Sequence, residues 1–287
     1  SMTTSGYARI AKLWQRGTPL SAATTVFEGK TEEVGAFAGH DFTPGFERDI
    51  IQNAVTFFTN ETFLLRDGKP VKIEKPIDAD ASLYREWLLL QLRTDWTVAG
   101  RTWPAGALLA AHLEEFLAGK REFDLLFEPT ERKSLAGFST TLHTIILNEL
   151  DNVKTRLYVL RHDGTTWTRT PIPGLPEFGS TSASSVDGYL SDDYFLTTTD
   201  FLTPSSLFLG TAGGDTPEKL KQSPSFFDAK GLVVGQHEAV SKDGTRIPYF
   251  EVARADLRAD GTAPTQLTGY GGFEVSNTPY YSGVTGS

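Results

Sequence analysis

The segment Thr62–Glu74, TFLLRDGKPVKIE, contains two short apolar stretches on either side of the dipeptide Asp67-Gly68. Phe63-Leu64-Leu65 precedes that dipeptide and Val71-Lys72-Ile73 follows it. An Asp-Gly pair readily adopts the positive φ angles that a tight reversal between antiparallel strands requires. The segment therefore predicts a β-hairpin.

The same arrangement recurs along the chain. Thr155–Thr170 reverses at Asp163-Gly164, and Ser205–Gln222 reverses at Ala-Gly-Gly-Asp. A longer hairpin is predicted from Gly231 to Val252, with its turn at Asp243-Gly244. Helical patterns are scarce, and only Asp80–Trp87 and Leu109–Leu117 suggest short helical turns. The sequence favours an all-β fold.

The predicted hairpins are periodic. One marker residue from the first strand of each recurs at intervals of 46 to 50 residues: Leu13, Phe63, Leu109, Leu157 and Leu207. A second short strand follows each marker, and apolar strands precede several of them, as in Trp87–Leu92, Thr144–Leu150 and Tyr194–Thr199. Repeats of roughly 40–50 residues with three or four strands are typical of β-propeller blades. A β-sandwich with coincidental spacing is the alternative.

Composition limits the class of protein. The 287 residues are 39% hydrophobic and 22% charged, with a net charge of −9 and no cysteine. The negative charge argues against binding to nucleic acid or to anionic membranes, and the absence of cysteine excludes disulfides and thiolate metal sites. The start of the chain lacks the apolar region of a signal peptide, which favours a cytoplasmic protein.

The repeat ends near Ser223, so we expect a domain boundary there. Residues 1–6 are interpreted as a tag remnant with an N-terminal extension, because the opening Ser1-Met2 is typical of a cloning remnant. Residues 7–223 are predicted to form the blades. Residues 224–287 are predicted to form a second domain, for which about 60 residues are too few to be complete.

Most motifs of catalytic chemistry are missing from the sequence. It contains no Gly-x-Ser-x-Gly nucleophile elbow, no phosphate-binding loop and no dinucleotide-binding fingerprint. The five histidines, which are His40, His112, His143, His162 and His237, are never two or four residues apart. We therefore expect no cofactor and no metal, and interpret the histidines as structural or solvent-facing.

Two kinds of residue pair have simple interpretations. Glu114-Glu115 and Asp192-Asp193 are interpreted as turn and solubility residues, since spatial pairing of carboxylates cannot be seen in a sequence. Phe57-Phe58 and Phe226-Phe227 are predicted to pack in the core or between blades.

The segment Gly269-Tyr270-Gly271-Gly272-Phe273 is more specific, and we expect a short strand before it. Glycines allow the backbone to turn sharply or to approach a ligand closely. A tyrosine hydroxyl held on such a turn could donate a hydrogen bond to a developing oxyanion. An ordinary glycine-rich loop is the alternative interpretation.

Three segments together resemble the prolyl oligopeptidase family of serine peptidases: SKDGTRIPYF at 241–250, GYGGFEVS at 269–276 and TPYYS at 278–282. In that family these segments open an α/β-hydrolase domain that follows a seven-bladed propeller. The resemblance implies a partial, open propeller of about four to five blades, followed by the first strands of a truncated hydrolase domain.

The resemblance also implies roles for individual residues. Tyr270 matches the tyrosine that helps to form the oxyanion hole, and Phe273 matches an aromatic residue of the substrate pocket. The family's catalytic Ser, Asp and His would lie beyond this chain, so the parent would be a peptidase of short proline-containing peptides and the chain alone inactive. The missing blades and catalytic domain would be its partners, and open propeller edges could cause self-association. A non-catalytic propeller that acts as a binding module is the alternative.

Overall fold

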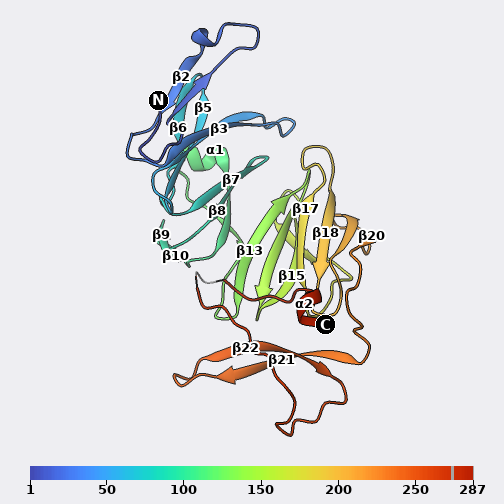
Figure 1. Cartoon of the computed structure of the whole chain (residues 1–287). Helices are drawn as coiled ribbons and strands as arrows, with labels where there is room; N and C mark the ends of the chain where they lie inside the picture. The colour runs from blue at the N-terminus through green and yellow to red at the C-terminus, as the bar shows by residue number, and fades with distance from the viewer. Residues whose placement is uncertain (273–274, 287) are drawn as a thin grey trace. The chain divides into compact units, whose positions relative to one another are not determined.

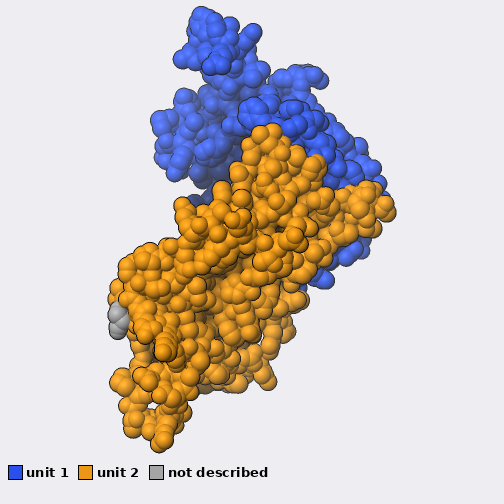
Figure 2. Space-filling view, turned by 90° about the vertical axis from the view of Figure 1, so that its right-hand side faces the viewer, with its two compact units in different colours: residues 1–129 blue, residues 130–287 orange. Residues whose placement is uncertain are grey.

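The computed structural model describes residues 1–272 and 275–286, and the regular secondary structure of these residues is almost entirely β-strand (Figure 1). The all-β prediction is confirmed. The chain divides into two compact units, residues 1–129 and 130–287 (Figure 2). None of the described helices is long and apolar enough to cross a membrane.

Unit 1 contains two four-stranded antiparallel sheets and two hairpins. The first sheet has the order β3 (Gly35–Asp41), β4 (Arg48–Ala54), β5 (Asn60–Arg66) and β6 (Lys69–Lys72). The second has the order β7 (Asp80–Tyr84), β8 (Trp87–Gln91), β11 (Leu108–His112) and β12 (Asp124–Phe127). The hairpins are β1 (Ile10–Leu13) with β2 (Thr24–Glu28), and β9 (Trp96–Val98) with β10 (Arg101–Trp103). A 3-10 turn, η1 (Leu20–Ala22), precedes β2, and α1 (Leu113–Leu117) follows β11.

Unit 2 has the same design. One sheet consists of β13 (Lys133–Thr140), β14 (Ile145–Asp151), β15 (Lys154–His162) and β16 (Trp167–Pro171). The next consists of β17 (Ser180–Ser185), β18 (Asp193–Thr199), β19 (Ser206–Thr211) and β20 (Glu218–Gln222). The hairpin of β21 (Leu232–Val240) and β22 (Arg246–Arg254) follows, and α2 (Gly283–Gly286) lies near the end of the chain.

The repeat predicted from the sequence corresponds to the four-stranded sheets. Phe63, Leu109, Leu157 and Leu207 each lie on the third strand of a four-stranded sheet, namely β5, β11, β15 and β19. Leu13 lies on β1, which pairs only with β2 among the described strands. Four complete sheets and the remainder of an earlier one are thus present, as predicted. The domain boundary near residue 223 stays a prediction.

The Asp-Gly turns have the backbone conformation that the sequence predicts. Asp67 and Gly68 have φ angles of 49° and 73°, the left-handed conformation that a two-residue hairpin turn requires. Gly164 and Gly244 also have positive φ, at 98° and 87°. The three Asp-Gly hairpins therefore form where they were predicted.

Within each unit, neighbouring sheets pack face to face. In unit 1, Leu64 of β5 shares a buried cluster with Leu88 and Leu90 of β8 and with Leu109 of β11. In unit 2, buried residues of β14 and β15 pack against β18, in a cluster that includes Ile146, Leu157, Tyr194 and Leu196. Second strands contribute alternate residues to these cores, namely Leu88 and Leu90 from β8 and Tyr194 and Leu196 from β18. Third strands contribute Leu64, Leu109 and Leu157.

The predicted helical turn at Asp80–Trp87 and the predicted strand at Thr265–Thr268 are wrong. Asp80–Tyr84 forms β7 rather than a helical turn, because pairing with the apolar strand β8 is available and an isolated helical turn has marginal stability. The second predicted helix is partly right, since Leu109–His112 completes β11 and only Leu113–Leu117 is helical. Thr265–Thr268 forms no strand, since the described chain places no partner strand beside it.

The aromatic pairs are not core residues. Phe57 and Phe58 lie on a turn with 87% and 80% of their surface exposed. Phe226 is 68% exposed, and Phe227 stacks on Tyr281 with ring centroids 4.8 Å apart. Their hydrophobicity predicted burial, but their place in connections between strands puts them at the surface.

Candidate functional site

Tyr270, the residue with the most specific prediction, lies in an irregular segment after β22. Its side chain is 57% exposed. A Cβ atom added at Gly272 would lie 3.0 Å from the Tyr270 hydroxyl, which places the phenol close to the Gly272 backbone. Gly269 and Gly271 have open space around them. The segment thus presents a hydroxyl on an open glycine turn, while Phe273 lies outside the described residues.

The segment after this turn is anchored to the last four-stranded sheet. Ser180 Oγ donates a hydrogen bond to the carbonyl of Pro279 at 2.5 Å, and the amide of Tyr281 donates to Thr199 Oγ1 at 3.2 Å. The Tyr281 hydroxyl accepts a hydrogen bond from the Phe226 amide at 2.7 Å. Both sides of the glycine turn are therefore connected to unit 2, on one side by β22 and on the other by this anchor.

The hairpin of β21 and β22 packs on the same unit through one of its faces. The Phe250 ring lies 5.5 Å from the Phe201 ring and 6.3 Å from the Phe178 ring. Gln236 Nε2, opposite Phe250, donates a hydrogen bond to the Asn152 carbonyl at 2.6 Å. The strands that lead to Tyr270 are thus held by connections between blade strands.

The other face of this hairpin is exposed. It carries three large apolar side chains beside an ion pair between His237 Nε2 and Glu251 Oε2, which lie 3.1 Å apart. Val233, Ile247 and Tyr249 alternate with the packed residues and are 50%, 50% and 45% exposed. Within the described chain, β21 and β22 pair only with each other. A two-stranded hairpin that exposes large apolar side chains on one face is usually part of a larger sheet.

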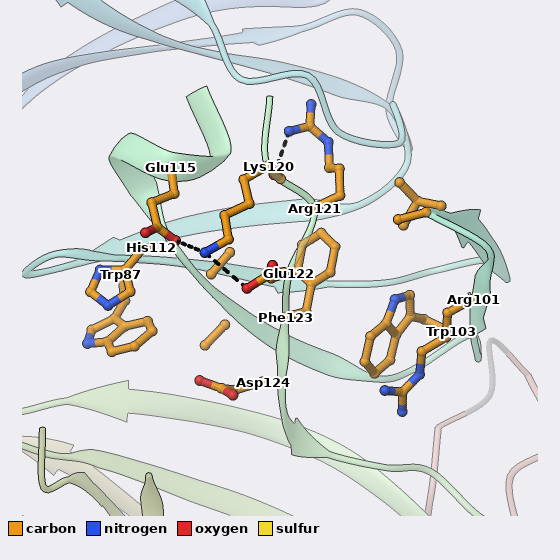
Figure 3. Close-up of a pocket in the computed structure, with 14 residues that line it drawn as sticks. Trp87, Arg101, Trp103, His112, Glu115, Lys120, Arg121, Glu122, Phe123 and Asp124 are labelled. Atoms are coloured by element: carbon orange, nitrogen blue, oxygen red, sulfur yellow. Dashed lines mark hydrogen bonds and ion pairs between the residues drawn. The ribbon is translucent and has the colours of Figure 1, made fainter. Parts of the chain in front are cut away.

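A second candidate site is a cleft of about 600 Å³ in unit 1 (Figure 3). Aromatic rings form much of its wall. The ring centroids of Trp87 and His112 lie 4.2 Å apart with the rings tilted, and the Arg101 guanidinium lies 3.5 Å from the Trp103 ring centroid. Lys120 lies between the carboxylates of Glu115 and Glu122, at 2.9 and 3.0 Å. The hydrogen bond to Glu115 raises the pKa of the Lys120 ammonium.

This cleft has groups for binding rather than for acyl transfer. Its lining residues include no serine, threonine or cysteine that could act as a nucleophile. The paired acids Glu114 and Glu115 do not act together, because Glu115 binds Lys120 while Glu114 binds Arg66. Over residues 1–272 and 275–286, no group of three or more His, Asp or Glu residues could hold a metal ion.

Asp192 has a contact that sequence reasoning missed. Its carboxylate accepts hydrogen bonds from Thr141 Oγ1 and from the His143 amide, both at 2.7 Å, and from His143 Nδ1 at 2.9 Å. Burial alone would raise the pKa of the Asp192 carboxyl, but these hydrogen bonds outweigh burial and hold it below its ordinary value. Both residues precede second strands of neighbouring repeats, a correspondence that the periodicity could have suggested.

Comparison with known proteins finds relatives among peptidases. No family model matches the chain. The chain is 35% identical to an uncharacterized peptidase, y4nA, of Sinorhizobium fredii, over 99% of this chain and 40% of the relative. It is 32% identical to a prolyl endopeptidase of Elizabethkingia meningoseptica over 37% of this chain and 15% of that enzyme. The chain thus spans about two fifths of the length of the curated relatives that it matches throughout.

Comparison with solved structures also finds peptidases. A post-proline cleaving enzyme from Rickettsia typhi superposes with a TM-score of 0.81 and 28% identity, over 98% of this chain and 42% of that enzyme. The chain is therefore homologous to peptidases of the prolyl oligopeptidase type along its whole length. The prediction of a partial propeller from this family is confirmed.

Proposed function

From the premise that this chain is a portion of a prolyl oligopeptidase-like peptidase, we propose that the longer protein is a serine peptidase of short proline-containing peptides. The chain contributes blades and the opening strands of the α/β-hydrolase domain. The catalytic Ser, Asp and His belong to the remaining part of that domain. The blades restrict access by substrate size, so that folded proteins are excluded and short peptides reach the nucleophile.

The observation that carries this proposal is the hairpin of β21 and β22 followed by the glycine turn at Tyr270. One face of the hairpin packs on blade connections through Phe250, and the opposite face exposes Val233, Ile247 and Tyr249. A hydrolase sheet that continues from this hairpin would cover these exposed apolar side chains and supply a partner for Thr265–Thr268. The order of blades, hairpin and glycine turn is the order that the family resemblance implies.

In this function the Tyr270 hydroxyl acts on the oxygen of the scissile carbonyl. Attack by the serine oxygen converts that carbonyl into a tetrahedral oxyanion, and a donor already in place stabilises the new charge. In the described part of the chain, no atom lies within 4 Å of a Cβ atom added at Gly269 or Gly271, so the backbone on either side of Tyr270 is open to a substrate. Phe273 contacts the proline side of the substrate.

Replacement of one hydroxyl tests this role. In the longer protein, Tyr270→Phe should lower kcat for a Gly-Pro reporter peptide by about 10²–10³-fold with little change in KM, since the hydroxyl acts on the transition state. Tyr280→Phe is the matched control, because Tyr280 is 63% exposed on the same segment. A Tyr270→Phe enzyme with kcat within twofold of wild type would contradict the assignment.

A further inference from the structure

The turn between β4 and β5 presents two aromatic rings to solvent. Phe57 and Phe58 are the most exposed phenylalanines in the part of the chain that the structure describes. Their rings are in edge contact, with centroids 5.1 Å apart. Ile77, whose carbonyl accepts a hydrogen bond from the Asn60 amide, is 48% exposed at the same end of the sheet. Together Phe57, Phe58 and Ile77 form what we call the aromatic turn.

The conformation of this turn is fixed by hydrogen bonds. The Val55 amide donates to the Thr59 carbonyl at 3.0 Å, and the hydroxyls of Thr56 and Thr59 are 2.7 Å apart. The Phe58 amide donates to Thr56 Oγ1 at 3.2 Å. Because the backbone of this turn is already ordered, the turn would lose little conformational entropy when a partner binds. Exposed apolar groups that are held in this way are typical of interaction surfaces.

In unit 2, the connections equivalent to this turn make contacts that can be compared with it. Phe57 and Phe58 of the aromatic turn lie in the connection between the second and third strands of their sheet, and the equivalent connections in unit 2 follow β14 and β18. Asn152, after β14, accepts a hydrogen bond from Gln236 of β21. Phe201, after β18, packs on Phe250 of β22. Both equivalent connections therefore contact the hairpin that begins the peptidase domain.

We infer that the aromatic turn is a docking contact for the peptidase domain of the longer protein. This inference rests on the proposed function, which supplies that domain. The occupant is an apolar surface of the domain, because the turn offers two phenyl rings and an isoleucine, with no charged side chain among the three residues. Since the equivalent turns contact an element of their own chain, the contact is intramolecular and does not need a second copy.

Photocrosslinking in the longer protein tests this contact. Phe58→p-benzoylphenylalanine is expected to form crosslinks within one chain, which mass spectrometry maps to residues of the peptidase domain beyond this segment. The same replacement at Phe42 is the matched control. Phe42 is 64% exposed, and it lies at the opposite end of the same sheet, between β3 and β4. We expect at least a fivefold higher yield of crosslinks to the peptidase domain from position 58 than from position 42.

Two results would overturn the inference: crosslinks from position 58 only to a second copy, or a yield no higher than from position 42. A second variant pair tests the same contact without a probe. Phe57→Ser with Phe58→Ser should increase the rate of proteolytic separation of the two domains at least threefold, whereas Phe42→Ser should not. Hydrolysis of the Gly-Pro reporter by each unirradiated protein reports separately on the proposed function.

Discussion

Asp192 and His143 lie 49 residues apart in the sequence, yet the Asp192 carboxylate accepts hydrogen bonds from both the amide and the Nδ1 of His143. The same carboxylate accepts a hydrogen bond from the Thr141 hydroxyl. One side chain thereby ties the start of β18 to the turn before β14, and joins two neighbouring blades.

Loss of this carboxylate should weaken unit 2. Asp192→Asn replaces an ionised acceptor by an amide that cannot accept all three hydrogen bonds, and the site is partly buried. We expect the free energy of unfolding to fall by about 1–3 kcal/mol in urea denaturation. Asp215→Asn removes an exposed carboxylate from the β19–β20 turn and should change stability by less than about 0.5 kcal/mol. Equal effects of the two substitutions would contradict the role of Asp192.

The contribution of Asp192 should disappear in acid. Because its pKa in the folded protein lies below the ordinary value, the stabilisation is fully present above the ordinary aspartate pKa of about 3.9. It is lost as the pH falls through the lowered pKa of the folded state. The difference in stability between wild type and Asp192→Asn should therefore decrease as the pH falls below about 4. A difference in stability that increases below pH 4 would contradict the lowered pKa of Asp192.

Lys75 should affect stability in the same direction, but at alkaline pH. Its ammonium donates hydrogen bonds to the carbonyls of Asn60 and Ala79, at 2.9 and 2.6 Å. Burial, the main cause, lowers the pKa of Lys75 to about 8. The unfolded chain then binds more protons between about pH 8 and pH 10.4, so this group favours folding increasingly as the pH rises.

Tryptophan fluorescence can follow this effect, because four of the five tryptophans lie in unit 1. Relative to a Lys75→Met variant, wild type should gain stability between pH 8 and pH 10. Lys69→Met, which removes an exposed ammonium from β6, is the comparison. A stability difference between wild type and Lys75→Met that does not change over this range would rule out the lowered pKa.

Gly210 should not tolerate a side chain. It faces Tyr194 across the β18–β19 pair, and an added Cβ would lie 2.7 Å from the Tyr194 ring. Tyr194 is 1% exposed and belongs to the core of unit 2, so it cannot move without repacking. Gly210→Ala should destabilise the protein by about 1–3 kcal/mol. Gly39→Ala, at a strand position with no atom within 4 Å, should cost much less in the same urea denaturation series.

The repeat was the most predictable feature of this fold. Markers such as Phe63 and Leu157 lie on equivalent strands because the alternation of apolar residues and Asp-Gly turns is local information. The structure of Thr265–Thr268 could not be predicted from local sequence. A strand needs a partner strand, and the described chain supplies none for this segment.

The candidate site was predictable only in part. The glycines around Tyr270 indicated an open turn, and the structure places an exposed phenol there. The contact between Asp192 and His143 depends on the packing of two sheets, which no single segment encodes. The exposure of Phe57 and Phe58 is likewise decided by their place in a turn, whereas hydrophobicity alone predicted burial.

Hydrolysis of a Gly-Pro reporter peptide, measured on this chain and on the longer protein side by side, tests the central claim most directly. The longer protein should cleave the reporter after proline and should be labelled covalently by a fluorophosphonate at its serine. The 287-residue chain, purified alone, should give neither cleavage nor labelling. Cleavage by the chain alone, or a longer protein that neither cleaves the reporter nor reacts with the fluorophosphonate, would contradict the account.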